Sequence, residues 1–271
     1  MKNVLPSAFL TTAVSAARLA GDIIIKNLGH LSNQDVQTKQ AFDFVTKVDR
    51  WSEAVILQTI REKFPSHRFL TEETLHQDDT GDYRWIIDPL DGTTNYIHGY
   101  PMFSVSIGLE FESELVLGVV FDPLKDELFH AVRGGGAFLN NNRISVSETT
   151  ALERSLLATG FPFRSKEMID LYLRAFKGIF LEVSDIRRAG SAALDLAYIA
   201  AGRLEAFFEL NLSPWDIAAG ALLIEEAGGL VTDFGGGAAY LKTGNVVAGS
   251  KQIQREILAN VQQVFRGVVD K

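Results

Sequence analysis

The sequence predicts a protein of mixed α and β structure, in which helices and sheets are stacked in layers. Apolar residues recur at helical spacing from about Ser7 to Leu28, and three strand-like segments follow one another between residues 103 and 132. After about residue 150, strand-like and helix-like segments alternate. Because amphipathic helices and half-buried sheets each need a partner for their apolar face, stacked layers are the expected outcome.

Composition excludes several functional classes. The chain has 271 residues, enough for one large domain or two closely packed halves. Its net charge of -8 argues against a general nucleic-acid surface and against binding to anionic membranes. The absence of cysteine excludes disulfides, zinc-thiolate sites and cysteine nucleophiles. With no apolar run of membrane-spanning length and no clear cleavable signal, we expect a cytoplasmic protein.

Two helices are expected near the N-terminus. The first should run from a cap at Ser7 to about Leu28, with its apolar residues on one face. The second should open at Asp49 and stop before Pro65, because proline cannot continue a helix. Residues 30–42 are polar and lack periodicity, which is typical of a loop.

Strands are expected to dominate the next part of the chain. Residues 68–70 should form a strand that ends in Thr71-Glu72-Glu73, and the acidic residues 74–84 should form a surface loop. Residues 85–87 are apolar and read as a short buried strand. Antiparallel strands are then expected over residues 103–111, 115–121 and 127–132, followed by a hairpin that continues to Leu139.

The last 120 residues should alternate between strands and helices. Strands are expected at residues 155–159, 185–188, 204–210, 230–233 and 245–248. Helices are expected at residues 166–181, 190–201, 214–227 and 250–266. Pro214 at a helix start and the glycine pair after residue 227 support the boundaries of the third of these helices.

One stretch of the sequence combines a buried strand with chemistry. Residues 85–87 lead directly into Asp88, and Asp91 follows three residues later, with Gly92 permitting a sharp bend. The two carboxylates and the Leu90 carbonyl can therefore converge on one point. Thr93 and Thr94 are good helix-start residues, so unpaired backbone N–H groups should lie beside the carboxylates. Oxygen ligands for a cation next to an anion site suggest a cation-bridged phosphate, although an ordinary Asp-Pro/Asp-Gly turn explains the same residues.

Further acids also lie at the ends of predicted elements: Asp49, Glu72, Glu73 and Asp216. Each has an ordinary explanation, as a helix cap, a solvated strand end or a partner of a helix dipole. Together, however, clustered carboxylates repel one another unless a cation neutralises them.

These motifs resemble the inositol monophosphatase family of metal-dependent, lithium-sensitive phosphatases. The stretch Asp88-Pro89-Leu90-Asp91-Gly92-Thr93-Thr94-Asn95 matches one family motif, and Trp215-Asp216-Ile217-Ala218-Ala219-Gly220 matches a second. Asp43-Phe44-Val45-Thr46 with Asp49, and Glu72-Glu73, match two more. The stretch Arg188-Ala189-Gly190-Ser191-Ala192-Ala193-Leu194-Asp195-Leu196 is similar to the bacterial branch. The motifs follow one another in the family order over nearly the whole chain.

The resemblance implies a layered α-β-α-β-α sandwich, usually a homodimer. Residues 1–271 would form one compact domain, with most metal motifs before about residue 150 and the substrate residues after it. One Mg²⁺ would bind Glu72, Asp88 and the Leu90 carbonyl, and a second would bind Asp88, Asp91 and Asp216. A third, looser ion would use Glu72 through water. An all-oxygen set without cysteine or a histidine cluster suits Mg²⁺ better than zinc.

The resemblance also assigns catalytic roles. Glu72 and Thr93 would orient the attacking water, with Asp49 holding Thr93. The amides of Gly92 and Thr93 would hold the phosphate. Glu73 would lie behind the metal ligands. Lys39 matches a family lysine near the site, but a solvated surface lysine explains it equally well.

On the substrate side, Glu209 matches the family acid that binds sugar-ring hydroxyls, and Ala192 matches a residue that contacts the ring through its backbone. One departure concerns the stretch Gly160-Phe161-Pro162-Phe163-Arg164, where animal members carry a serine. This departure affects the expected inositol pocket more than the metal site.

We therefore expect a Mg²⁺-dependent phosphomonoesterase that hydrolyses inositol-1-phosphate, with a small phosphorylated polyol or sugar as its partner. The enzymatic alternatives are related phosphatases for fructose-1,6-bisphosphate, histidinol phosphate or a nucleotide 3′-phosphate. A different class also stays open, in which the protein binds other macromolecules, alone or in addition to catalysis.

Overall fold

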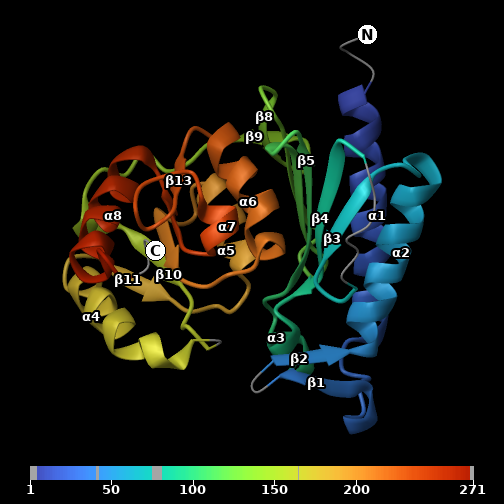
Figure 1. The fold of residues 1–271 in the computed structure, drawn as a ribbon, viewed down its shortest axis with the longest axis horizontal. Coiled ribbons are helices and arrows are strands. Elements are labelled where there is room, and N and C mark those ends of the chain that lie inside the picture. Colours follow the sequence, from blue (N-terminus) through green and yellow to red (C-terminus); the bar gives the residue numbers. More distant parts are fainter. Residues whose placement is uncertain (1–4, 41–42, 75–80, 164, 269–271) are drawn as a thin grey trace.

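The computed structural model describes residues 5–40, 43–74, 81–163 and 165–268. Its elements form five layers in the order helices, seven-stranded sheet, helices, five-stranded sheet, helices (Figure 1). The helical layers are α1 (Leu5–Asn27) with α2 (Lys47–Lys63), α5 (Ala192–Ala200) with α6 (Pro214–Glu226), and α4 (Ile169–Phe180) with α8 (Lys251–Phe265). The predicted α-β-α-β-α sandwich is confirmed.

The seven-stranded sheet lies between the first two helical layers. Its order follows the chain: β3 (Arg68–Thr71), β4 (Tyr83–Asp91), β5 (Ser104–Phe111), β6 (Glu114–Asp122), β7 (Glu127–Val132), β8 (Gly136–Leu139) and β9 (Asn142–Ile144). Only the pair β3–β4 is parallel; the other neighbours are antiparallel, as predicted for the central strands. Strands β3 and β4 run parallel, with Thr71 beside Ile87. The next residues, Glu72 and Asp88, therefore lie side by side at the same end of the sheet.

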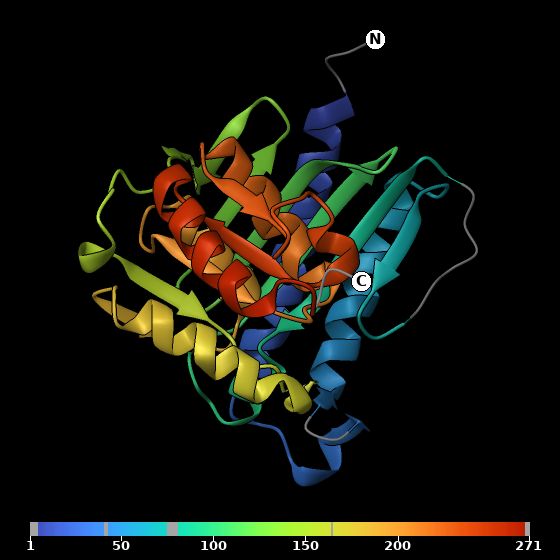
Figure 2. The ribbon, with the colours of Figure 1, turned by 60° about the vertical axis from the view of Figure 1, so that its left-hand side comes forward.

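The five-stranded sheet is mixed. Its order is β11 (Asp185–Arg187), β10 (Leu156–Thr159), β12 (Ala206–Glu209), β14 (Val246–Gly249) and β13 (Leu230–Thr232). Strand β10 is parallel to both of its neighbours, whereas β14 is antiparallel to both of its own. Helices α4 and α8 cover its outer face (Figure 2). The parallel pair β10–β12 brings Gly160 and Glu209 together at one end of the sheet.

The helical layer between the two sheets is built from small residues. Ala218, Ala219 and Gly220 of α6 are all buried, and α6 packs against both β5 and β6. Small side chains let the helix approach the sheet closely. The start of α6, with Asp216, consequently lies near the end of β4.

The largest difference from the sequence prediction lies in residues 30–42. Instead of a loop, β1 (Val36–Gln40) pairs antiparallel with β2 (Asp43–Thr46), while residues 41–42 lie outside the described part. This hairpin stands outside the layers (Figure 1). Strand β1 has no buried face, so its sequence does not alternate between apolar and polar residues. The periodicity of the sequence therefore could not reveal this strand.

Two boundaries next to the site also differ. Helix α2 begins at Lys47 with Thr46 as its cap, so Asp49 is the third helical residue rather than the opening one. Strand β4 is longer than residues 85–87 and includes Pro89, which it accommodates because pairing with β5 is irregular between Asp88 and Asp91. Most of the predicted loop at 74–84 lies outside the described residues.

Within the described residues, one helix is long and apolar enough by length and composition to cross a membrane: the stretch Ser7–Asn27 of α1. This finding differs from the prediction that no apolar run reaches membrane-spanning length. Of this window, 44% is buried inside the protein, where α1 packs against α2, β5 and β6. A core helix of this kind passes the same test, so the finding is weak evidence for a membrane span.

Candidate active site

A cavity of about 280 Å³ lies where the end of β4, the starts of α5 and α6, and the ends of β10 and β12 meet. Nine of the residues predicted to form the site line it: Glu72, Asp88, Leu90, Asp91, Gly92, Thr93, Ala192, Glu209 and Asp216. Asp49, Glu73 and Lys39 are not among its lining residues. They contact the site from behind, through the hydrogen bonds described below.

The turn after β4 is fixed by its own residues. Asp88 Oδ1 accepts a hydrogen bond from the Leu90 N–H at 2.9 Å, which folds the chain back on itself. Gly92 has a φ of +94° and caps the short helix α3 (Thr93–Ile97). A side chain at Gly92 would place its Cβ 2.8 Å from the Met102 carbonyl oxygen, so only glycine fits this bend.

Three carboxylates converge at this turn. Asp88, Asp91 and Asp216 each offer an oxygen, and these three atoms all lie within 4.8 Å of one another. All three side chains are buried. Asp216 Oδ2 also accepts a hydrogen bond from the Ser213 N–H at 2.8 Å, so the same side chain closes the start of α6 and joins the cluster. We refer to Asp88, Asp91 and Asp216 as the acid cluster.

Burial strongly disfavours charge in the acid cluster. Burial raises the pKa of Asp88 well above its usual range, and the charges of Glu72, Asp91 and Asp216 raise it further. Burial also raises the pKa of Asp91 to about 6, although the Ser191 hydroxyl and the Ala193 N–H, at 2.6 and 2.8 Å, oppose the shift. A bound cation can neutralise such a group of oxygens. The donor set, which contains oxygen alone, fits Mg²⁺.

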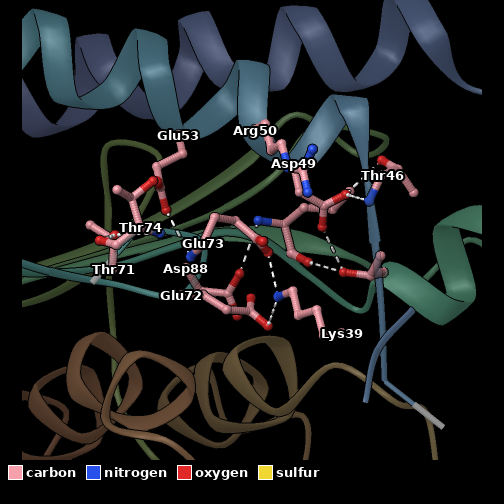
Figure 3. A network of polar contacts seen from close by, with 12 residues as sticks. Lys39, Thr46, Asp49, Arg50, Glu53, Thr71, Glu72, Glu73, Thr74 and Asp88 are labelled. Carbon is pink, nitrogen blue, oxygen red and sulfur yellow. Dashed lines mark hydrogen bonds and ion pairs between the residues drawn. The ribbon is translucent and has the colours of Figure 1, made fainter. Parts of the chain in front are cut away.

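Glu72 lies beside the acid cluster rather than within it. Its Oε1 is 2.9 Å from Lys39 Nζ, and the same ammonium lies 2.5 Å from Glu73 Oε1 (Figure 3). The Glu73 N–H donates in turn to Glu53 Oε2 at 3.0 Å. Burial, followed by the Glu72 charge, raises the pKa of Glu73 to about 7. Lys39 is thus an ion-pair partner of two acids beside the acid cluster.

The Thr93 hydroxyl is held by two acceptors. It lies 2.8 Å from Asp49 Oδ1 and 3.1 Å from the Leu90 carbonyl oxygen. Asp49 is itself anchored, because its Oδ2 accepts hydrogen bonds from the Thr46 N–H and hydroxyl at 2.9 and 2.6 Å. Burial raises the pKa of Asp49 to about 6. The same carboxylate therefore closes the start of α2 and orients Thr93 toward the site.

The Glu209 end of the cavity requires glycine at position 160, the first residue of the departing stretch. Glu209 ends β12 and Ala192 begins α5, and both line the cavity. A Cβ at Gly160 would lie 2.0 Å from Glu209 Oε1, so any side chain there would require Glu209 to move. The glycine thus leaves room for the Glu209 carboxylate. Arg164, also part of the departing stretch, lies outside the described residues.

Comparison with known proteins agrees with this geometry. The model of the inositol monophosphatase family matches residues 5–266. The chain belongs to the inositol monophosphatase family.

One relative compared by sequence and two solved structures illustrate this membership. The chain is 48% identical over 254 residues to the protein named Nus factor SuhB of Escherichia coli K12, covering 93% of this chain and 95% of the relative. The structure of the extragenic suppressor protein suhB from Bartonella henselae is 41% identical, with a TM-score of 0.90 and coverage of 96% and 100%. The inositol monophosphatase structure from Anabaena sp. PCC 7120 is 40% identical, with a TM-score of 0.86 and coverage of 95% and 96%.

Several site residues of this family member were missed by sequence reasoning. Ser191, expected only to begin a helix, caps α5 and also donates to Asp91. Asn95 Nδ2 donates to the carbonyls of Met102 and Ala189 and so ties the β4 turn to the stretch before α5. Asp195 lines the cavity from α5, one turn after Ser191. Helical spacing from Ser191 and Ala192 would have placed Asp195 on the same face.

The raised pKa values predict how Mg²⁺ and pH act together on the stability of this inositol monophosphatase family member. The ordinary pKa of Asp49 and Asp91 is 3.8, and in the folded protein both rise to about 6. Between these values the folded, metal-free protein holds more protons than the unfolded chain. Its free energy of unfolding should therefore fall as pH rises through this window.

A Mg²⁺ ion bound by the acid cluster would compete with the proton on Asp91, so its stabilising effect should grow with pH. At about a hundred times its dissociation constant, Mg²⁺ should add roughly 2.7 kcal/mol, a rise of about 5–10 °C in melting temperature. Thermal melts of chelated protein with and without Mg²⁺, at about pH 5 and about pH 8, measure the effect. A rise of equal size at both pH values would contradict the linkage.

Proposed function

We propose that this protein is a Mg²⁺-dependent phosphomonoesterase that hydrolyses inositol-1-phosphate to inositol and phosphate. The observation that carries the proposal is the acid cluster, whose three oxygens lie within 4.8 Å of one another at the wall of a cavity that also contains Thr93 and Glu209. Family membership supports a phosphatase. The similarity to the Anabaena inositol monophosphatase favours inositol phosphate among the possible substrates.

The donor atoms support two or three Mg²⁺ ions. Glu72, Asp88 and the Leu90 carbonyl would hold one ion, and the acid cluster would hold a second. A third would bind more loosely beside Glu72. When bound, these cations would activate a water molecule and balance the charge that develops on the entering and leaving oxygens.

The chain's own residues supply orientation. The Thr93 hydroxyl, fixed by Asp49, and the Glu72 carboxylate, fixed by Lys39, would position the attacking water. The backbone N–H groups of Gly92 and Thr93 would donate to the phosphate oxygens. Glu209 would accept hydrogen bonds from the substrate hydroxyls, and the Ala192 backbone would contact the ring. Glu73 would support Glu72 through their shared partner Lys39.

The reaction is tested directly by phosphate release. Purified protein should release phosphate from inositol-1-phosphate near neutral or mildly alkaline pH, lose this activity in EDTA, and regain it when Mg²⁺ is restored in excess. The Asp91→Asn variant, assayed in parallel, controls for contaminating phosphatases. Full activity of the metal-stripped protein would refute the metal mechanism. Faster turnover of fructose-1,6-bisphosphate, histidinol phosphate or a nucleotide 3′-phosphate would change the substrate but not the chemistry.

A second candidate role is suggested by the name of the relatives. The E. coli protein, 48% identical over most of both chains, is named a Nus factor, so we propose that this chain also binds a macromolecular partner. The expectation of no general nucleic-acid binding rests on net charge alone and does not oppose a specific protein or RNA partner. Affinity capture with wild type and Asp91→Asn separates the roles, because binding that survives the loss of catalysis is independent of it.

We also propose that the protein is a lithium-sensitive, cytoplasmic homodimer and that residues 1–271 act as one catalytic domain. Family membership supports these proposals. Sedimentation of the purified protein and inhibition of phosphate release by Li⁺ are the corresponding measurements.

A further inference from the structure

We propose that Asp195 is a hydroxyl-recognising residue of the cavity, which with Glu209 selects polyhydroxylated monophosphates and disfavours substrates that carry a second phosphate. This inference rests on the proposed phosphatase function and specifies its substrate class. It assigns a role to a residue that the motifs of the metal site leave unused.

Asp195 is placed by helix α5. Ser191 caps this helix, Ala192 is its first residue, and Asp195 follows three residues later. Residues three and four apart lie on one helix face, so Asp195 faces the same cavity as Ser191 and Ala192. All three are lining residues of that cavity.

The carboxyl group of Asp195 has no hydrogen-bond partner within the described part of the chain, and the largely buried residue lines the cavity. The residue is 3% exposed, and within the described part of the chain no hydrogen bond or ion pair to its side chain is found. A buried polar group that lacks a hydrogen bond carries a free-energy cost. That cost would be removed by a ligand that fills the cavity and pairs with Asp195.

An ordinary explanation is that an acid in the first turn of α5 interacts with the helix dipole. That interaction operates equally well at an exposed position. Asp170 illustrates this, since it occupies the first turn of α4 and is exposed. The dipole therefore does not account for the burial of Asp195 against the cavity.

The charges around Asp195 indicate the class of ligand. Burial raises the pKa of Asp195 well above its usual range, the charges of Glu209 and Asp91 raise it further, and Arg188 opposes them. A substrate hydroxyl can donate to a carboxylate and accept from a carboxylic acid, so it pairs with Asp195 in either protonation state. A second phosphate at this end would face Asp195 and Glu209, which disfavour another anion.

The test compares three substrates in the Mg²⁺-loaded protein: inositol-1-phosphate, fructose-1,6-bisphosphate and 4-nitrophenyl phosphate. Asp195→Leu removes all hydrogen-bonding capacity and should raise KM for inositol-1-phosphate by about tenfold or more. Its kcat/KM for 4-nitrophenyl phosphate, which has no hydroxyl groups, should stay within about twofold of wild type. Asp195→Asn, which keeps the shape, should show a smaller loss and an improved ratio of bisphosphate to monophosphate turnover.

Asp170→Asn serves as the matched control and should change no substrate preference. Equal losses on inositol-1-phosphate and 4-nitrophenyl phosphate would overturn the recognition role, as would an unchanged KM for inositol-1-phosphate in Asp195→Leu. Because Asp195→Asn is isosteric, its melting temperature shows whether a loss reflects folding. A wild-type protein that hydrolyses 4-nitrophenyl phosphate but no polyol phosphate would overturn this inference and the choice of inositol-1-phosphate as substrate, but not the phosphomonoesterase activity. One that hydrolyses no phosphate ester would overturn the proposed function as well.

Discussion

Replacing Asp91 with asparagine is expected to lower turnover by about a thousandfold, which corresponds to roughly 4 kcal/mol of lost transition-state stabilisation. The change keeps the shape of the side chain but removes one charge from the acid cluster. The hydrogen bonds that Asp91 accepts from the Ser191 hydroxyl and the Ala193 N–H can be retained by the asparagine carbonyl oxygen. The loss should therefore reflect cation binding and catalysis rather than folding.

The fold of this variant can be followed separately. Without metal, Asp91→Asn should be as stable as wild type or more stable, because a buried charge that repels its neighbours has been removed. Its Mg²⁺-induced rise in melting temperature should be smaller. Asp170→Asn is a suitable control, since Asp170 is exposed on α4 and does not line the cavity. Near-normal turnover, or an undiminished Mg²⁺ effect, would show that Asp91 is not a ligand.

Replacing Thr93 with alanine should lower turnover by about a hundredfold or more, because a hydroxyl that orients the reacting water is lost. Thr93 contributes a side-chain oxygen between Asp49 and the Leu90 carbonyl but is not a member of the acid cluster. The concentration of Mg²⁺ that gives half-maximal activity should therefore change little. This separation of turnover from metal affinity distinguishes Thr93 from Asp91.

Thr93→Ser provides the matched control, because it keeps the hydroxyl and removes only a methyl group. It should retain most of the turnover. Steady-state rates over a Mg²⁺ titration measure both quantities for the three proteins. If Thr93→Ser lost as much activity as Thr93→Ala, the packing of the methyl group rather than the hydroxyl would be responsible. A large loss of Mg²⁺ affinity in Thr93→Ala would assign Thr93 to metal binding.

Much of the fold was predictable because its signals are local. The antiparallel strands β5, β6 and β7 were identified from apolar segments and short turns, which act within a few residues. The start of α6 was identified from Pro214 followed by an apolar run. Strand β1 was missed because it is stabilised by pairing with β2, and a polar strand outside the layers carries no periodic signal.

The acid cluster and the Glu209 end of the cavity differ in the same way. The turn from Asp88 to Gly92 is a sequence-local structure, so the convergence of Asp88 and Asp91 followed from residue types and spacing. The contact between Gly160 and Glu209 instead depends on the parallel pairing of β10 with β12, and a sequence does not display the register between strands 49 residues apart.

The sequence by itself thus determined the layered fold class, the turn that bears Asp88 and Asp91, and a family whose motifs occur along nearly the whole chain. Short-range turn geometry and side-chain periodicity are physical properties of the local chain, so they can be inferred without a structure. Only the tertiary structure decided that Lys39 pairs with Glu72 and Glu73 and that Asp195 is buried against the cavity. It also brings Asp216, which the family resemblance had grouped with Asp88 and Asp91, into the acid cluster from α6. These features depend on which distant segments of the chain pack together. Burial and neighbouring charges, rather than residue type alone, then set the pKa of each group.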